Sequence, residues 1–194
     1  MKPIYLVPLA AGSGPTLPGG GPSGANAGPG IDLLEHLAAA LARIFCTPCR
    51  IRPQVVDLGF ALDPGRGQYH STAILQHMER VCESQARVLG VTSCDLYVPV
   101  LTFVFGEAQL DGNCAVVSTA RLQEEFYGLP GREELLRRRL IKEAVHELGH
   151  TFGLRHCPDW RCVMTSSHAV ERLDVKQEEF CPSCRKSVLV EGYW

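Results

Sequence analysis

The segment from His146 to His156 restricts the fold of this chain more than any other feature of its sequence. It reads HELGHTFGLRH. On a helix, His146 and His150 lie four residues apart and project from the same face. This spacing allows two imidazole nitrogens to approach one Zn²⁺ at about 2.0–2.1 Å. The segment therefore predicts a long helix, from about residue 132 to residue 152, that carries two ligands of one metal ion.

Gly153 predicts how this helix ends. A residue without Cβ adopts positive φ readily, so the chain can turn sharply after the helix. The turn would bring His156 back as a third nitrogen ligand, and three protein ligands leave one zinc position for water, as in catalytic sites. Glu147, beside His146, could then accept a proton from that water. The alternative is a solvated helix with three unrelated histidines, which five matches at fixed spacing disfavour.

Four cysteines follow the histidines in two pairs, at Cys157, Cys162, Cys181 and Cys184. Four thiolates complete a tetrahedral zinc site and leave no position open, which is typical of a structural zinc. Such a site would hold together an irregular C-terminal segment that has few apolar residues. Two disulfides or four unrelated buried thiols remain the alternative, which a reducing compartment disfavours.

The order of these residues, with Met164 and the 16 residues between it and Cys181, resembles the archaemetzincin family of zinc metallopeptidases. The resemblance covers roughly Arg121 to Cys184. It implies that Glu147 is the general base and that Met164 lies beneath the catalytic metal. It also implies a catalytic zinc on His146, His150 and His156, and a second, structural zinc on Cys157, Cys162, Cys181 and Cys184.

The alternation of apolar patterns predicts an α/β fold. The expected strands are Ile4–Leu9, Val55–Leu58, Leu96–Phe105 and Asn113–Thr119, and the expected helices are Asp32–Phe45, Thr72–Leu89 and residues 132–152. We expect Leu96–Phe105 to be a central strand buried on both faces. We expect Asn113–Thr119 to lie at a sheet edge, where an extended peptide could add by main-chain hydrogen bonds.

The resemblance refines this expectation to a zincin-like mixed twisted sheet with backing helices and a long active-site helix. A small, irregular, zinc-fastened C-terminal subdomain would follow. We therefore expect a single catalytic domain over residues 1–194, made of an N-terminal subdomain at 1–153 and a C-terminal subdomain at 154–194. The Gly- and Pro-rich residues 12–30 are outside the family pattern and are interpreted as a flexible loop.

The expected function is zinc-dependent hydrolysis of peptide bonds in a peptide or protein substrate. A catalytically weak or silent zinc-stabilised module that binds peptides or proteins is the alternative. The presence of Glu147 argues against it, because a purely structural zinc needs no base beside it. A formal net charge of −2 disfavours binding to nucleic acid.

The chain is also expected to be a cytoplasmic monomer with no membrane attachment. No apolar run approaches the ~20 residues of a membrane span. The apolar stretch near the N-terminus is short and contains prolines, unlike a signal peptide.

The remaining polar and cysteine patterns have local interpretations. Cys46 and Cys49 are separated by two residues at the end of a helix, which favours packing or an incidental disulfide over a redox or metal site. Cys82, Cys94 and Cys114 are expected in the core. The basic run Arg137–Arg139 is expected on a solvated face. Asp174 and Gln177 are expected to form a capping box before a helix that carries Cys181 and Cys184.

Overall fold

A mixed six-stranded sheet forms the centre of the molecule. The computed structural model describes residues 2–11, 28–81 and 85–190, so the stretch 12–27 and Cys82 lie outside the described residues. Five strands follow in the order β2 (Cys49–Ile51), β1 (Ile4–Ala10), β6 (Arg87–Thr92), β9 (Cys114–Ser118) and β8 (Gly106–Ala108). A sixth, β3 (Val56–Asp57), also pairs with β1. Only β8 runs antiparallel to its neighbour in this sheet.

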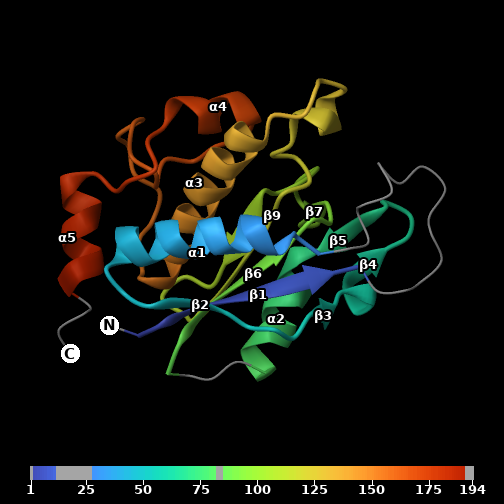
Figure 1. The fold of residues 1–194 in the computed structure, drawn as a ribbon, viewed down its shortest axis with the longest axis horizontal. Coiled ribbons are helices and arrows are strands. Elements are labelled where there is room, and N and C mark those ends of the chain that lie inside the picture. Colours follow the sequence, from blue (N-terminus) through green and yellow to red (C-terminus); the bar gives the residue numbers. More distant parts are fainter. Residues whose placement is uncertain (1, 12–27, 82–84, 191–194) are drawn as a thin grey trace.

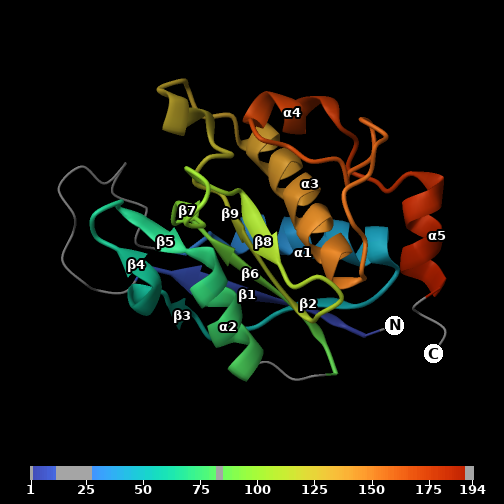
Figure 2. The ribbon, with the colours of Figure 1, turned by 180° about the vertical axis from the view of Figure 1, so that it is seen from behind.

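Helices cover both faces of the sheet (Figures 1 and 2). Helix α1 (Ile31–Phe45) and helix α3 (Glu133–Thr151) share one apolar core with inward residues of β1, β6 and β9. Helix α2 (Ser71–Val81) packs in a second core on the opposite face. The sheet is therefore the middle layer of three, as an α/β chain requires to bury both of its faces.

Smaller elements surround these layers. A three-stranded sheet follows the order β4 (Leu62–Asp63), β5 (Gln68–His70) and β7 (Leu96–Tyr97), with the short helix η1 (Gly59–Ala61) before it. The short helix η2 (Glu124–Tyr127) precedes α3, and α4 (Val170–Val175) and α5 (Pro182–Val190) follow it. Within the described ranges, none of the helices has both the length and the apolarity needed to cross a bilayer.

The sequence predictions for β1, α1, β3, β9 and α3 are confirmed to within a few residues. The helix expected over Thr72–Leu89 is wrong at its end, because α2 stops at Val81 and the buried strand β6 begins at Arg87. The strand expected over Leu96–Phe105 is also wrong. Only Leu96 and Tyr97 form a strand, and Val100 is 88% exposed in the loop that follows. A short apolar run does not by itself distinguish a buried strand from other structures.

The edge of the main sheet is β8 and not β9. β9 lies between β6 and β8, so the prediction that residues 113–119 form an edge strand is wrong. The Gly-Glu-Ala sequence of β8 has no alternating apolar pattern, and pairing with β9 makes it a strand. This edge matters because β8 lies beside α3, the helix with the two histidines.

Arg139 and Asp174 also differ from the predictions. The Arg139 side chain is 4% exposed and pairs with Glu124 and with Asp174, each at 2.7 Å. Arg139 is therefore an internal anchor of α3, although Arg138 next to it is exposed. Asp174 forms no capping box, because it lies within α4 and α5 begins at Pro182.

Candidate metal centres

Helix α3 and the turn after it bring three histidines together. His146 and His150 lie on consecutive turns of α3, and Gly153 has a φ of 73° where the helix ends. The N–H groups of Gly153 and Leu154 donate to the carbonyls of His150 and Gly149. The reversed chain returns His156 to the helix, so that one ring nitrogen from each histidine lies within 4.8 Å of the others. The predicted grouping of the three side chains is confirmed as geometry.

Hydrogen bonds fix the orientation of two of these imidazoles. His146 Nδ1–H donates to the carbonyl of Val163 at 2.9 Å, and His150 Nδ1–H donates to the carbonyl of Leu154 at 2.7 Å. A carbonyl oxygen can only accept a hydrogen bond, so each Nδ1 atom carries a hydrogen. In the neutral imidazole, each Nε2 atom then presents a lone pair. These Nε2 atoms face each other at 3.2 Å.

Two facing lone pairs are the arrangement that a shared cation requires. Two ligands at about 2.0–2.1 Å from a tetrahedral zinc lie about 3.3 Å apart, close to the observed separation of the Nε2 atoms. Burial lowers the pKa of His146 well below its ordinary value and also lowers the pKa values of His150 and His156. Neutral imidazole is the form that binds metal. The three histidines therefore fit a zinc ion.

Glu147 lies next to His146 and is buried under the first residue of β8. Burial raises the pKa of its carboxyl group well above the ordinary value, the Glu143 carboxylate raises it further, and the Lys176 ammonium opposes them. A Cβ placed on Gly106 would lie 2.7 Å from Glu147 Cγ, which locates the carboxylate at the sheet edge. A carboxylate with a raised pKa is suited to exchanging protons near neutral pH.

Met164 packs against α3 close to the histidines. It is fully buried, and a Cβ on Gly149 would clash with its Sδ atom and lie 3.2 Å from a ring carbon of Phe180. Gly149 separates Leu148 from His150 on the helix. The methionine therefore lies against the helix turn that carries His150.

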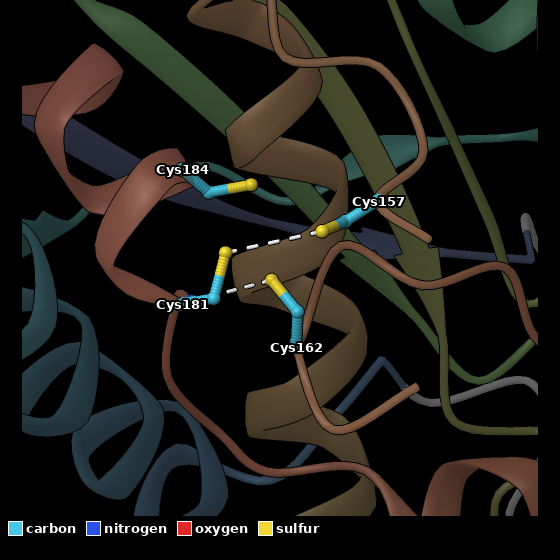
Figure 3. A group of neighbouring side chains, drawn as sticks. All are labelled: Cys157, Cys162, Cys181 and Cys184. Atoms are coloured by element: carbon cyan, nitrogen blue, oxygen red, sulfur yellow. Dashed lines mark hydrogen bonds between the residues drawn. The ribbon is translucent and has the colours of Figure 1, made fainter. Parts of the chain in front are cut away.

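The four predicted cysteines form a second cluster, drawn in Figure 3. Their sulfurs all lie within 4.8 Å of one another. The Cys157 and Cys181 sulfurs are 3.8 Å apart, and two sulfurs at about 2.3 Å from a tetrahedral zinc would be about 3.8 Å apart. All four thiols are free, so the structure does not contain the two alternative disulfides.

The environment of the cluster favours a thiolate at Cys181. The backbone N–H of Cys184 lowers the pKa of Cys181, while burial raises the pKa values of Cys162 and Cys184. The N–H of Cys181 also donates to the sulfur of Cys162 at 3.3 Å. Sulfurs that accept N–H bonds are typical of metal-binding thiolates, and this donor set fits a structural zinc.

Cys46 and Cys49 are separate from both clusters. Both are free thiols, so the structure contains no disulfide between them. Cys46 is exposed at the C-terminus of α1, where its φ is 51°. Burial raises the pKa of Cys49 to about 12, and its side chain packs against the main core. The packing interpretation holds for Cys49. Cys94 and Cys114 are buried, as predicted.

Strand β8 has main-chain groups beside Glu147 that face away from β9. Ser118 N–H donates to the carbonyl of Phe105, and Gln109 N–H donates to the carbonyl of Cys114. Because hydrogen-bonded and non-hydrogen-bonded pairs alternate in antiparallel strands, Gly106 and Ala108 direct their N–H and C=O groups away from β9. β8 is the last strand of the sheet in the described part of the chain. Sequence reasoning missed this strand, because Gly-Glu-Ala carries no pattern typical of a strand.

Comparisons with known proteins agree with this geometry. The model of peptidase family M54 matches residues 61–189. An archaemetzincin from Methanocaldococcus jannaschii is 40% identical over 84% of this chain and 89% of its own length. The crystal structure of an archaemetzincin from Methanopyrus kandleri has a TM-score of 0.79 and 34% identity, covering 100% of this chain and 96% of that one. An archaemetzincin from Archaeoglobus fulgidus, complexed with malonate, gives a TM-score of 0.75 and 35% identity over 95% and 99% of the two chains.

Proposed function

This chain belongs to the archaemetzincins, peptidase family M54, and is a zinc metallopeptidase; from that premise we propose the roles of its residues. His146, His150 and His156 hold the catalytic zinc, and Glu147 is the general base. The four cysteines of the second cluster hold a structural zinc. The active unit is a cytoplasmic monomer that acts on peptides or proteins, and the free thiols of the second cluster fit a reducing compartment.

One observation carries the proposal: the facing Nε2 lone pairs of His146 and His150, 3.2 Å apart. Their orientation is set by two carbonyls that accept from the Nδ1 atoms, so it does not arise from a hydrogen bond between the rings. Bonds of this kind fix the tautomer of metal-binding histidines. His156 is exposed, so a substrate can approach the three histidines from the solvent side.

Glu147 moves the proton in the proposed reaction. When bound, zinc supplies a Lewis acid that polarises the scissile carbonyl and makes water more acidic. Glu147 accepts a proton from the attacking water and then donates it to the leaving amine. Burial raises the pKa of its carboxyl group well above the ordinary value, so this group takes up a proton more readily than an exposed glutamate does.

The outer edge of β8 is proposed to bind the substrate main chain. The outward-facing groups of Gly106 and Ala108 can pair with an extended peptide, which would add one strand to the sheet. Gly106 also abuts Glu147, so a peptide held there passes beside the general base. This assignment transfers the sequence-based hypothesis from β9 to β8.

A peptide mixture tests the proposal. Metal-free protein, the same protein reconstituted with zinc, and reconstituted His150→Asn would each be incubated with the mixture, and products identified by mass spectrometry. We expect cleavage only by the reconstituted wild type. His150→Asn is expected to keep one zinc per chain, at the cysteines, where the wild type keeps two.

Two results would contradict the proposal. Equal cleavage by the metal-free protein would show that the reaction does not require zinc. A wild type with two zinc ions and no cleavage of any peptide would instead favour the zinc-stabilised binding module.

A further inference from the structure

Lys176 is a buried cation that the proposed reaction does not use. Its side chain has no exposed surface, and its Nζ lies 3.0 Å from Glu143 Oε1 and 3.4 Å from the carbonyl of Thr165. Burying an ammonium group costs free energy unless it is paired and hydrogen-bonded. A lysine in this position therefore needs an explanation from its partners.

The two partners of Lys176 belong to different parts of the catalytic centre. Glu143 lies on α3, one turn before Glu147. Thr165 ends the segment Val163–Thr165, which lies in the connection between α3 and α4 beside α3 (Figures 1 and 2). Lys176 thus joins this segment to the helix that carries His146 and His150.

The segment Val163–Thr165 is fastened to α3 at three consecutive residues. The carbonyl of Val163 accepts from His146 Nδ1–H at 2.9 Å. Met164 packs against Gly149. Thr165 is held through Lys176 to Glu143. Only the first contact touches a histidine, and the other two hold the two residues that directly follow Val163.

We propose that Lys176 is a positioning residue for the histidine metal centre: by clamping Thr165 to Glu143, it fixes the Val163 carbonyl and so the orientation of His146. The inference rests on the proposed role of His146 as a zinc ligand. Groups that orient a ligand in this way typically change metal affinity or activity by about 10–100-fold when they are removed.

The backbone next to Lys176 is hydrogen-bonded to residues 161–163, close to the cysteine cluster. Gln177 N–H donates to the carbonyl of Arg161 at 2.8 Å, and Val163 N–H donates to the carbonyl of Glu179 at 3.1 Å. The chain then reaches Cys181, whose N–H donates to the Cys162 sulfur. Residues 176–181 therefore run along residues 161–163, with Lys176 at one end of this stretch and Cys181 of the cysteine cluster at the other.

The test separates positioning from the stability of a buried ion pair. Lys176→Met alone would leave Glu143 buried without a counter-charge and would destabilise the fold. The double variant Glu143→Gln/Lys176→Met removes both charges together, so most of the stability should return while the clamp on Thr165 stays absent. The readouts are the affinity for the histidine-site zinc by chelator competition, the melting temperature, and kcat and KM at saturating zinc.

Lys142→Met is the matched control. Lys142 lies on α3 and is buried, as Lys176 is. Its Nζ donates to the carbonyls of Leu173 and Asp174, which lie outside the segment Val163–Thr165. The zinc at the cysteines, which His150→Asn is expected to retain, is the internal reference for chelator competition.

We expect the double variant to bind the histidine-site zinc about 10–100-fold more weakly and to lose kcat with little change in KM, while Lys142→Met matches the wild type in both. Wild-type zinc affinity in the double variant would overturn the proposal. If that variant does not fold, Glu143→Leu/Lys176→Met, which fills the site with apolar side chains, is judged by the same two results. Failure of the proposed function would be seen in the wild type itself, as a chain without zinc at its histidines.

Discussion

At the scale of single residues, the position of Glu147 determines which residue β8 can accept at its first position. A Cβ on Gly106 would lie 2.7 Å from Glu147 Cγ and 2.6 Å from the carbonyl oxygen of Val116. The second of these atoms is backbone and cannot rotate away. A glycine is therefore required where the sheet edge, the catalytic helix and the proposed substrate strand meet.

Gly106→Ala is expected to impair the peptidase more than the fold. Overpacking of this kind costs about 1–3 kcal/mol of unfolding free energy, and here the Glu147 side chain must also leave its position. We expect kcat to fall by at least about tenfold, since displacing a general base forfeits part of its 10²–10⁴-fold contribution. Gly30→Ala is the control, because no atom lies within 4 Å of a Cβ at that position. A wild-type kcat in Gly106→Ala would refute the packing argument.

The buried carboxyl group of Glu147 should also cost stability in the metal-free protein. Its folded pKa is raised above the unfolded value, so its ionisation removes stability as the pH rises from about 4.5 through the folded pKa. Metal-free Glu147→Gln should therefore melt above the metal-free wild type at pH 7 and at nearly the same temperature below pH 4.5. Thermal unfolding at several pH values measures this, and a difference that does not depend on pH would contradict it.

At the scale of elements, α3 is held in place by polar contacts along its whole length. Arg139 pairs with Glu124 and Asp174 near its start, and Lys142 binds two carbonyls at the end of α4. At its C-terminus, Asp111 N–H donates to the carbonyl of His150 at 2.9 Å. The first two contacts hold the start of α3 against η2 and α4, and the third holds its C-terminus against the turn between β8 and β9.

Arg139→Met should destabilise the protein by about 3–5 kcal/mol, because it leaves two carboxylates without their buried partner. The neighbouring Arg138→Met is the control. Arg138 is 56% exposed and its ion pair with Glu178 is 3.7 Å long, so its loss should cost less than about 1 kcal/mol. Denaturant unfolding of both variants measures the two costs. Equal losses of unfolding free energy would indicate that burial of the ion pairs of Arg139 adds nothing to the stability of the protein.

The sequence predicts those elements whose signals are local. The spacing of His146 and His150, the glycine at 153 and the paired cysteines are read within one helix or one turn, and the structure brings these side chains together as expected. The end of α2, the strand β6 and the edge strand β8 are misread, because pairing with distant strands determines them. Arg139, Glu143 and Lys176 acquire their roles from partners 11 to 35 residues away, as in the pair of Arg139 and Asp174, so no local pattern indicates them.

At the scale of the whole molecule, the two proposed metal centres involve different parts of the chain. The histidines join α3 to the turn at Gly153, on top of a core shared with α1 and the sheet. The cysteines join the loop at 157–162 to the start of α5. The second centre would therefore support residues 157–190, which contain the short helices α4 and α5.

Cys181→Ser is expected to loosen the C-terminal residues without unfolding the sheet. Binding of a structural zinc contributes directly to folding, so losing one ligand should open the segment it closes. Hydrogen exchange should speed up over residues 157–190 and stay slow in β1, β6 and β9. The control is Cys46→Ser, because Cys46 is exposed and outside the cluster. Uniform acceleration over the whole chain would show that the cysteine centre holds the entire fold.

The kcat of Glu147→Gln tests the central claim most directly. Wild type and variant would be loaded with zinc, matched at two ions per chain, and assayed on one peptide that the wild type cleaves. We expect the variant to keep both zinc ions and to lose about 10²–10⁴-fold in kcat, the contribution of a general base. A kcat near that of the wild type, with the zinc content unchanged, would contradict the assignment of Glu147 and with it the proposed mechanism.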